Sequence, residues 1–144
     1  MDANEINRLL VNEKNFIGVF ALDKLPKKKV NRPVSMIINN EVSGEKGEHW
    51  VSLVMLKKQA YYFDSFGLQI IDKQILSFLA KQKITKVIFS TKCIQSITSD
   101  KCGLFCILFV KTVKNKNQYK KFLNLFSENQ LSINDHLVVE YLKF

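Results

Sequence analysis

The chain has 144 residues, a formal net charge of +9 and a hydrophobic fraction of 47%. This length and composition favour a single folded domain, residues 1–144, and argue against a disordered chain. The longest apolar run, residues 104–110, is far shorter than the ~20 residues that span a bilayer, and the first residues carry no secretory signal, so we expect a protein that is neither membrane-spanning nor secreted.

The first part of the chain predicts one helix and one strand. Residues 2–14 have a helix-like spacing, which predicts a helix over this segment. Gly18 and Pro26 bracket residues 19–25, which we expect to form a loop, and the lysines at 27–29 with Pro33 predict an exposed connection. Residues 34–38 are apolar and partly β-branched, so they predict a strand, and residues 39–47, with Gly44 and Gly47, predict a turn or longer loop.

A β-hairpin is predicted next. Residues 49–56 form its first strand, 57–60 its turn and 61–64 its returning strand, which 65–67 close. Such a hairpin makes neighbours of the residues at its open end, so we expect His49 and Asp64 to lie side by side. Apolar residues from Ile71 to Leu79 then predict a helix ending near Lys83, and residues 87–89 predict a buried strand.

The segment that begins at Cys102 follows a polar loop, residues 91–100. From Cys102 to about Lys114 the side chains are apolar on nearly all sides, which predicts a central buried helix. A strand would also fit the apolar run, but the polar residues before it and the absence of alternation favour a helix. Two more helices are predicted, over 117–126 and 133–143, the second capped by Ser132 or Asn134.

A thiol at the start of a buried helix is a candidate nucleophile. Free N–H groups and the positive end of the helix dipole favour the thiolate, which is the reactive form. His49 would accept the thiol proton, and Asp64 would orient the imidazole and stabilise its charged form. Gln95 would offer a side-chain N–H to a developing oxyanion, beside the backbone N–H of Cys102.

Each of these residues also has a plainer interpretation. A single His in a strand is more often structural, and a Cys in an apolar segment more often packs in a core, which is our interpretation of Cys106. His136, on the last predicted helix, is a competing base, but no hairpin pairs it with a carboxylate. Three cysteines, two of them four residues apart on one predicted helix, are a poor disulfide framework and favour a reducing compartment. Their spacings also lack the signature of zinc ligands, so we expect no metal site.

Several segments resemble the adenovirus-type cysteine proteases (adenain), which belong to the same clan as the SUMO-deconjugating Ulp1-type proteases. Residues 47–51, Gly-Glu-His-Trp-Val, are similar to the family's catalytic His-Trp strand. Residues 62–67, Tyr-Phe-Asp-Ser-Phe-Gly, are similar to its acid-bearing strand. Gln95 and residues 102–106, Cys-Gly-Leu-Phe-Cys, are similar to its oxyanion donor and nucleophile helix. Residues 17–26 and 36–39 are similar to the viral branch, and the resemblance covers residues 15–112.

The resemblance implies an α+β, adenain/Ulp1-like cysteine protease fold, with a small mixed β-sheet packed on a central nucleophile-bearing helix and with flanking helices. It implies a cysteine endopeptidase that cleaves viral capsid and core precursors at Gly-containing sites during virion maturation, in the virion and the infected host cell. Trp50 would shield the imidazolium or simply fill the core. The acid is Asp64, where adenain has Glu and the Ulp1-type branch has Asp.

The expected partners are viral precursor polypeptides and DNA, and we expect a monomer without membrane contacts. The sequence requires no cofactor, but the family's stimulation by DNA and by a viral peptide makes both candidate activators. Cys93 has no obvious equivalent of the family's peptide-binding cysteine. A DNA contact would use the densest group of lysines, although only two of the 22 basic residues are Arg, which phosphate recognition favours. This group consists of Lys111, Lys114, Lys116, Lys120 and Lys121.

Two alternatives remain at this point. A deconjugase for ubiquitin-like proteins would use the same four residues on the same fold. A non-catalytic DNA-binding relic of the fold is the second alternative, although the intact set of His49, Asp64, Gln95 and Cys102 argues against decay.

Overall fold

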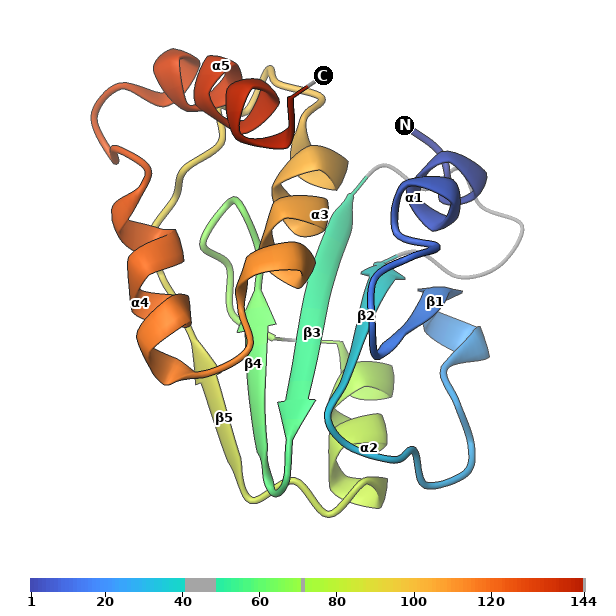
Figure 1. Cartoon of the computed structure of the whole chain (residues 1–144). Coiled ribbons are helices and arrows are strands. Elements are labelled where there is room, and N and C mark those ends of the chain that lie inside the picture. The colour runs from blue at the N-terminus through green and yellow to red at the C-terminus, as the bar shows by residue number, and fades with distance from the viewer. Residues whose placement is uncertain (41–48, 71, 144) are drawn as a thin grey trace.

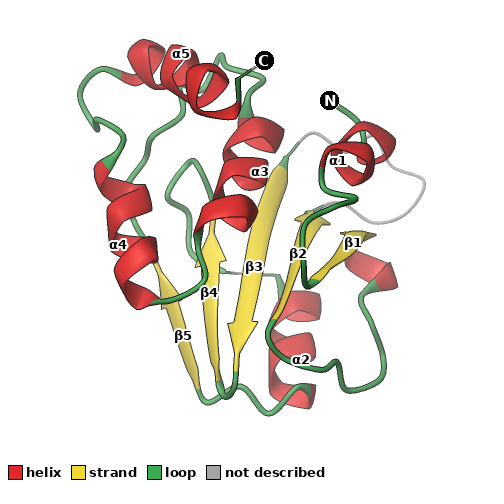
Figure 2. Ribbon diagram, viewed as in Figure 1, coloured by secondary structure: helices red, strands yellow, loops and turns green. Residues whose placement is uncertain are grey.

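The structure is a computed structural model that describes residues 1–40, 49–70 and 72–143. In these ranges, five strands form one mixed sheet in the order β1-β2-β3-β4-β5. Helix α3 lies across one face of the sheet, with α4 and α5 beside it, and α2 covers the other face (Figures 1 and 2). This is the arrangement predicted from the sequence, a small mixed sheet packed on a central helix.

In the described ranges, β2, β3 and β4 follow one another along the chain, and α3, α4 and α5 come after the last strand. The strands are β1 Phe16–Ala21, β2 Val34–Asn39, β3 Trp50–Leu56, β4 Gln59–Phe63 and β5 Lys86–Phe89. The helices are α1 Ala3–Leu9, the short 3-10 helix η1 Leu22–Lys24, α2 Lys73–Lys81, α3 Cys102–Thr112, α4 Lys116–Asn124 and α5 Leu131–Leu142. The pairs β2–β3 and β3–β4 are antiparallel, whereas β1–β2 and β4–β5 are parallel.

Alternation along the central strands divides the core between the two faces of the sheet. Tyr61 and Phe63 pack on the face covered by α3. Leu53 and Tyr62 point the other way and pack with α2. Because both faces are covered, the central strands read as nearly continuous apolar runs, which is why the hairpin was predictable from composition.

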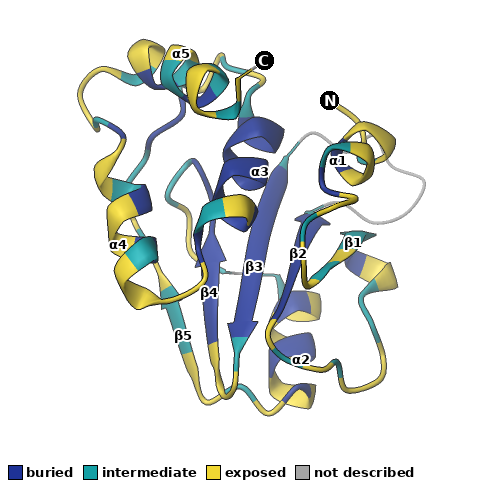
Figure 3. Cartoon of the chain, viewed as in Figure 1, coloured by how far each residue is buried: buried dark blue, intermediate teal, exposed yellow. Residues whose placement is uncertain are grey.

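Helix α3 is the most deeply buried helix in the described structure. Every residue from Cys102 to Val110 is buried, between β3 on one side and α4, α5 and α1 on the others (Figure 3). Phe109 stacks on Phe63 with ring centroids 5.0 Å apart and meets Phe122 of α4 edge to face. The prediction of a central buried helix is confirmed, and its first residue is Cys102.

The N-terminal predictions need two corrections. Helix α1, capped by a reciprocal pair of hydrogen bonds between Asp2 and Glu5, ends at Leu9 instead of reaching residue 14. The predicted loop at 19–25 is wrong, because residues 19–21 belong to β1 and 22–24 form η1. Gly18, at φ +135°, sits within an irregularity of the β1–β2 register, which interrupts the strand pattern.

The predictions for the C-terminal half need two further corrections. The predicted buried strand at 87–89 is an edge strand, and Phe89 is 42% exposed. Helix α5 begins at Leu131 with no side-chain cap, so the predicted caps Ser132 and Asn134 are wrong. Asn134 is instead fully buried, and its amide bonds to the backbone of Ser127 and Ile94.

Some predictions fall outside the described residues. They concern the loop at 41–47 with Gly44 and Gly47, the Glu48 position of the family motif, and Ile71 in the predicted second helix. None of the helices in the described ranges is long and apolar enough to cross a bilayer.

Candidate active site

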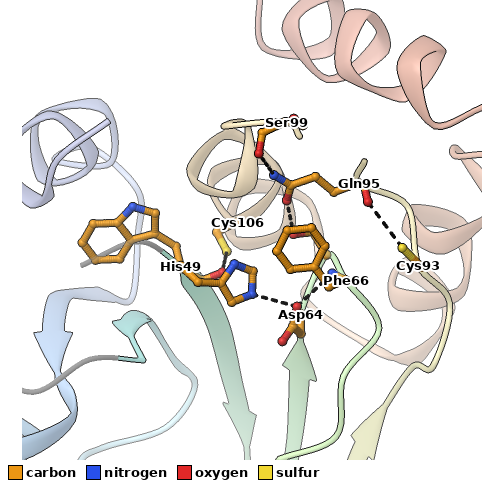
Figure 4. A network of polar contacts seen from close by, with 9 residues as sticks. His49, Asp64, Phe66, Cys93, Gln95, Ser99 and Cys106 are labelled. Carbon is orange, nitrogen blue, oxygen red and sulfur yellow. Dashed lines mark hydrogen bonds and ion pairs between the residues drawn. The ribbon is translucent and has the colours of Figure 1, made fainter. Parts of the chain in front are cut away.

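Four chain segments bring the predicted site residues to one end of the sheet. His49 directly precedes β3 and Asp64 directly follows β4, and these strands run antiparallel with Ser52 opposite Phe63. Cys102 begins α3, which lies across β3, and Gln95 lies in the loop that leads to it. Figure 4 shows His49, Asp64 and Gln95 converging at this end of the sheet.

His49 and Asp64 form a direct, shielded contact. His49 Nε2 lies 2.8 Å from Asp64 Oδ1, and the two side chains are only 12% and 4% exposed. The same oxygen accepts the backbone N–H of Phe66 at 2.8 Å. An ionised carboxylate only accepts hydrogen bonds, so Nε2 carries the ring hydrogen and Nδ1 is the nitrogen left to exchange a proton.

The Cys102 side chain acts on the same imidazole. Nδ1 of His49 is buried, and it is the ring nitrogen that does not contact Asp64, so it is available to the Cys102 side chain. Burial opposes protonation of the ring, but the hydrogen bonds and negative charges of Asp64 and Cys102 outweigh it and raise the pKa of His49 from 6.5 to about 9. The protonated form of the His49 ring is therefore stabilised at this site.

Phe66 packs on the imidazole, which sequence reasoning did not anticipate. The two rings are stacked, with centroids 4.8 Å apart and planes at 27°. A signal existed, because continuing the hairpin register by three residues from the Ser52–Phe63 pair sets His49 opposite Phe66. The stacked ring and the bond to Asp64 together fix the orientation of the imidazole.

Trp50 lies against the start of helix α3. It is 7% exposed and donates Nε1–H to the carbonyl of Met1 at 3.3 Å. A Cβ on Gly103 would lie 3.4 Å from its Cδ1, so glycine at this position lets the indole approach the helix closely. Of the two roles left open for Trp50, its burial in the core beside Cys102 favours the packing role.

The other two cysteines have different environments. Cys106, one turn into α3, is fully buried and donates Sγ–H to the carbonyl of Trp50 at 3.3 Å. Burial raises the pKa of Cys106 well above its ordinary value, so this thiol stays neutral. Cys93 is partly exposed and donates its thiol hydrogen to the carbonyl of Gln95 at 3.3 Å.

The amide of Gln95 is held in one orientation by its neighbours. Gln95 is 1% exposed, its Oε1 accepts a hydrogen bond from the Ser65 hydroxyl, and its Nε2 donates to the carbonyl of Ser99 at 2.9 Å. The amide nitrogen carries two hydrogens, and the bond to Ser99 uses one of them. The second can serve an oxyanion, together with the N–H of Cys102, which is among the first N–H groups that a helix does not use internally.

Ser65 links the acid loop to the oxyanion loop. Its carbonyl accepts the backbone N–H groups of Ile94 at 2.9 Å and Gln95 at 3.2 Å. The sequence gives no signal for these contacts, because a serine after a strand is usually a turn residue. The loop beside Asp64 and the loop that carries Gln95 are thus held together directly.

The remaining candidates lie away from this end of the sheet. His136 is exposed on α5. The five lysines of the predicted DNA-binding surface are exposed at the end of α3 and on α4, but Lys114 is already paired with Glu13 and bonded to the carbonyl of Val110. Within the described ranges, no three His, Cys, Asp or Glu side chains come together as metal ligands would.

Comparisons with known proteins identify relatives of the chain by sequence and by fold. Residues 16–132 match the adenovirus endoprotease family. The protease of bovine adenovirus 2 is 30% identical over 116 residues, which are 72% of this chain and 53% of that protein. The chain thus spans about half the length of this relative.

Two solved structures share the fold. The crystal structure of the ASFV pS273R protease has a TM-score of 0.56 at 15% identity, and the match covers 94% of this chain and 64% of the other. The central domain of the uncharacterized Lpg1148 protein from Legionella pneumophila has a TM-score of 0.58 at 16% identity, covering 99% of this chain and 96% of the other. These likenesses confirm the predicted α+β fold class.

Proposed function

The chain belongs to the adenovirus endoprotease family of cysteine endoproteases, and we propose that it is an active cysteine endopeptidase with Cys102 as its nucleophile. The observation that carries the proposal is the position of His49. Its Nε2 is bonded to a buried carboxylate at 2.8 Å, while its other nitrogen is left for the thiol that begins α3. A purely structural histidine would not need an anionic partner on each side.

The reactive form of the proposed site is an ion pair of imidazolium and thiolate. With the pKa of His49 at about 9, the protonated ring is favoured by about a hundred to one at pH 7. The N-terminus of α3 would stabilise a negative sulfur. Transfer of the thiol proton of Cys102 to Nδ1 of His49 generates the nucleophilic thiolate.

Acylation uses the pair and the two oxyanion donors. The sulfur of Cys102 attacks the peptide carbonyl carbon, forming a C–S bond while the carbonyl oxygen becomes an oxyanion. Gln95 Nε2–H and the N–H of Cys102 donate to this oxygen. When the intermediate collapses, the C–N bond breaks, and Nδ1–H of His49 protonates the departing amine.

Deacylation reverses the roles. A water molecule attacks the thioester carbonyl, and the now neutral Nδ1 of His49 takes its proton. The C–S bond breaks, the acid product leaves, and the imidazolium–thiolate pair is restored. Asp64 keeps Nε2–H in place throughout, so the ring presents the same nitrogen to the thiol, the amine and the water.

The proposed substrates are viral capsid and core precursor polypeptides, cut at Gly-containing sites during virion maturation, in the virion and the infected host cell. The support is the family and the likeness to the proteases of bovine adenovirus 2 and ASFV. We propose that the enzyme acts as a monomer. DNA and a viral peptide are the proposed activators, with DNA bound by the exposed lysines at the end of α3 and on α4.

The test is cleavage of a Gly-containing capsid-precursor peptide by purified protein. We expect Cys102→Ala to abolish cleavage, and Cys106→Ala, which removes a buried neutral thiol in the same helix, to retain most of it. Cleavage that survives Cys102→Ala would overturn the proposal. Efficient labelling of Cys102 by a ubiquitin-like vinyl sulfone, with no cleavage of precursor peptides, would favour the deconjugase alternative.

A further inference from the structure

An open apolar groove lies beside the catalytic residues. Its volume is about 540 Å³. No residue that lines it carries a charge. Two of its side chains are among the most exposed large hydrophobic residues of the described structure, Leu68 at 59% and Ile97 at 90%. The apolar lining is formed chiefly by Phe66, Leu68, Ile97 and Leu131, with Cys93 between them.

The groove is continuous with the catalytic centre through two residues. Phe66, which lines the groove, stacks on the imidazole of His49. Gln95, which also lines the groove, is the proposed oxyanion donor. A polypeptide bound with its scissile carbonyl at Gln95 therefore has this groove within reach of a neighbouring side chain.

The position of the departing amine decides which side of the substrate reaches the groove. The departing amine must receive its proton from His49, so the residue after the scissile bond lies over the imidazole. Phe66 stacks on that imidazole and also lines the groove. Chain that continues past the imidazole thus enters the groove, whereas the residues before the scissile bond lie on the other side of the carbonyl.

We propose that this groove is a specificity subsite for an apolar side chain within the first three residues after the scissile bond. The inference rests on the proposed endopeptidase function and adds a preference on the leaving side of the substrate. The exposed Leu68 and Ile97 become covered when the side chain binds, which gives a favourable apolar contact. A charged side chain would lose water there without gaining a partner.

The experiment compares matched internally quenched peptides that carry Leu or Asp after the scissile bond. We expect wild-type protein to favour Leu by about tenfold or more in kcat/KM. The double variant Leu68→Lys, Ile97→Lys should reverse the preference towards Asp. Both residues are so exposed that the fold does not depend on them, and Leu76→Lys on α2, an exposed leucine away from the site, should keep the wild-type preference.

Two controls separate the possible failures. The same Leu-to-Asp exchange placed before the scissile bond should give the same ratio in wild-type protein and the double variant. The subsite is overturned if the Leu-to-Asp ratio of kcat/KM differs between the two proteins when the exchange lies before the scissile bond. It is also overturned if the ratio is the same in both proteins when the exchange lies after the scissile bond. Failure of the proposed function looks different, because a peptidyl-aminocoumarin, which has no amino acid after the scissile bond, would then be hydrolysed no faster by wild-type protein than by Cys102→Ala.

Discussion

Replacing Asp64 with Asn separates the charge of this side chain from its hydrogen bonds. In the structure, Asp64 Oδ1 accepts both Nε2–H of His49 and the N–H of Phe66, each at 2.8 Å. An amide oxygen can accept the same two hydrogens, so Asp64→Asn can keep the ring in place. It removes the negative charge that helps to hold His49 protonated.

The expected effect follows from the strength of the bond that changes. A hydrogen bond to a charged group contributes about 1.5–3 kcal/mol, and a neutral one about 0.5–1.5 kcal/mol. The difference, roughly 1–1.5 kcal/mol, corresponds to about one pH unit. The lost attraction between charges acts in the same direction, and burial then opposes protonation with less compensation, so the titration midpoint of His49 should fall from about 9 by at least about one pH unit.

NMR titration of the imidazole signals measures this directly. The chain contains only two histidines, so His136, exposed on α5, gives the reference signal in the same spectra. The alkaline limb of kcat/KM should move to lower pH with the His49 signal, because the deprotonated ring cannot protonate the departing amine. A His49 midpoint that stays near 9 in Asp64→Asn would refute the role given to the Asp64 charge.

Three further perturbations test the surroundings of the site. Gly67→Ala should lower the free energy of unfolding by about 2–4 kcal/mol in urea denaturation, because Gly67 has φ +72° and a Cβ would lie 2.5 Å from the carbonyl oxygen of Thr91. An unchanged urea midpoint would contradict this close approach. Asn134→Ala should cost a similar ~2–4 kcal/mol in the same assay, since it removes three hydrogen bonds to the backbone of Ser127 and Ile94, and Asn129→Ala on the exposed neighbouring loop is its matched control. Changing a test set of four exposed lysines to Gln should weaken binding to duplex DNA and reduce the slope of log affinity against log salt by up to about four. Changing a control set of four lysines on another part of the surface should leave both quantities unchanged. Equal effects of the test set and the control set would reject a defined DNA-binding surface. The test set is Lys111, Lys116, Lys120 and Lys121, and the control set is Lys57, Lys58, Lys81 and Lys83.

The parts of the fold that the sequence predicts well are those whose pattern is local. Residues 102–110 are apolar on every side because helix α3 is surrounded on every side, so composition alone identifies it. The hairpin of β3 and β4 is similarly local, with only Lys57 and Lys58 between its strands. Hairpin geometry then brings His49 and Asp64 to the same end, and no long-range information is needed for that step.

The parts that the sequence misses depend on contacts between distant segments. β1 forms by parallel pairing with β2 across a long connection, and its own pattern is broken at Gly18. Residues 87–89 form an apolar run, yet their strand lies at the edge because nothing pairs with its outer side in the described sheet. Asn134 resembles a helix cap in sequence, but its amide serves the backbone of Ser127 and Ile94. No local pattern encodes such a contact.

The described site consists of two units with His49 between them. One unit is helix α3, in which Cys102 and the eight residues after it are buried and closely packed. The other unit is the pair of loops that Ser65 joins. Asp64 directly precedes Ser65 in the first loop, and Ser65 binds Gln95 of the second loop through its hydroxyl and carbonyl groups. The acid and the oxyanion donor therefore move together if they move at all. His49 belongs to neither unit, and its position relative to Cys102 depends on the bond to Asp64 and the stacked ring of Phe66. A change that loosens the joined loops should thus impair proton transfer and oxyanion stabilisation together, even when it leaves Cys102 untouched.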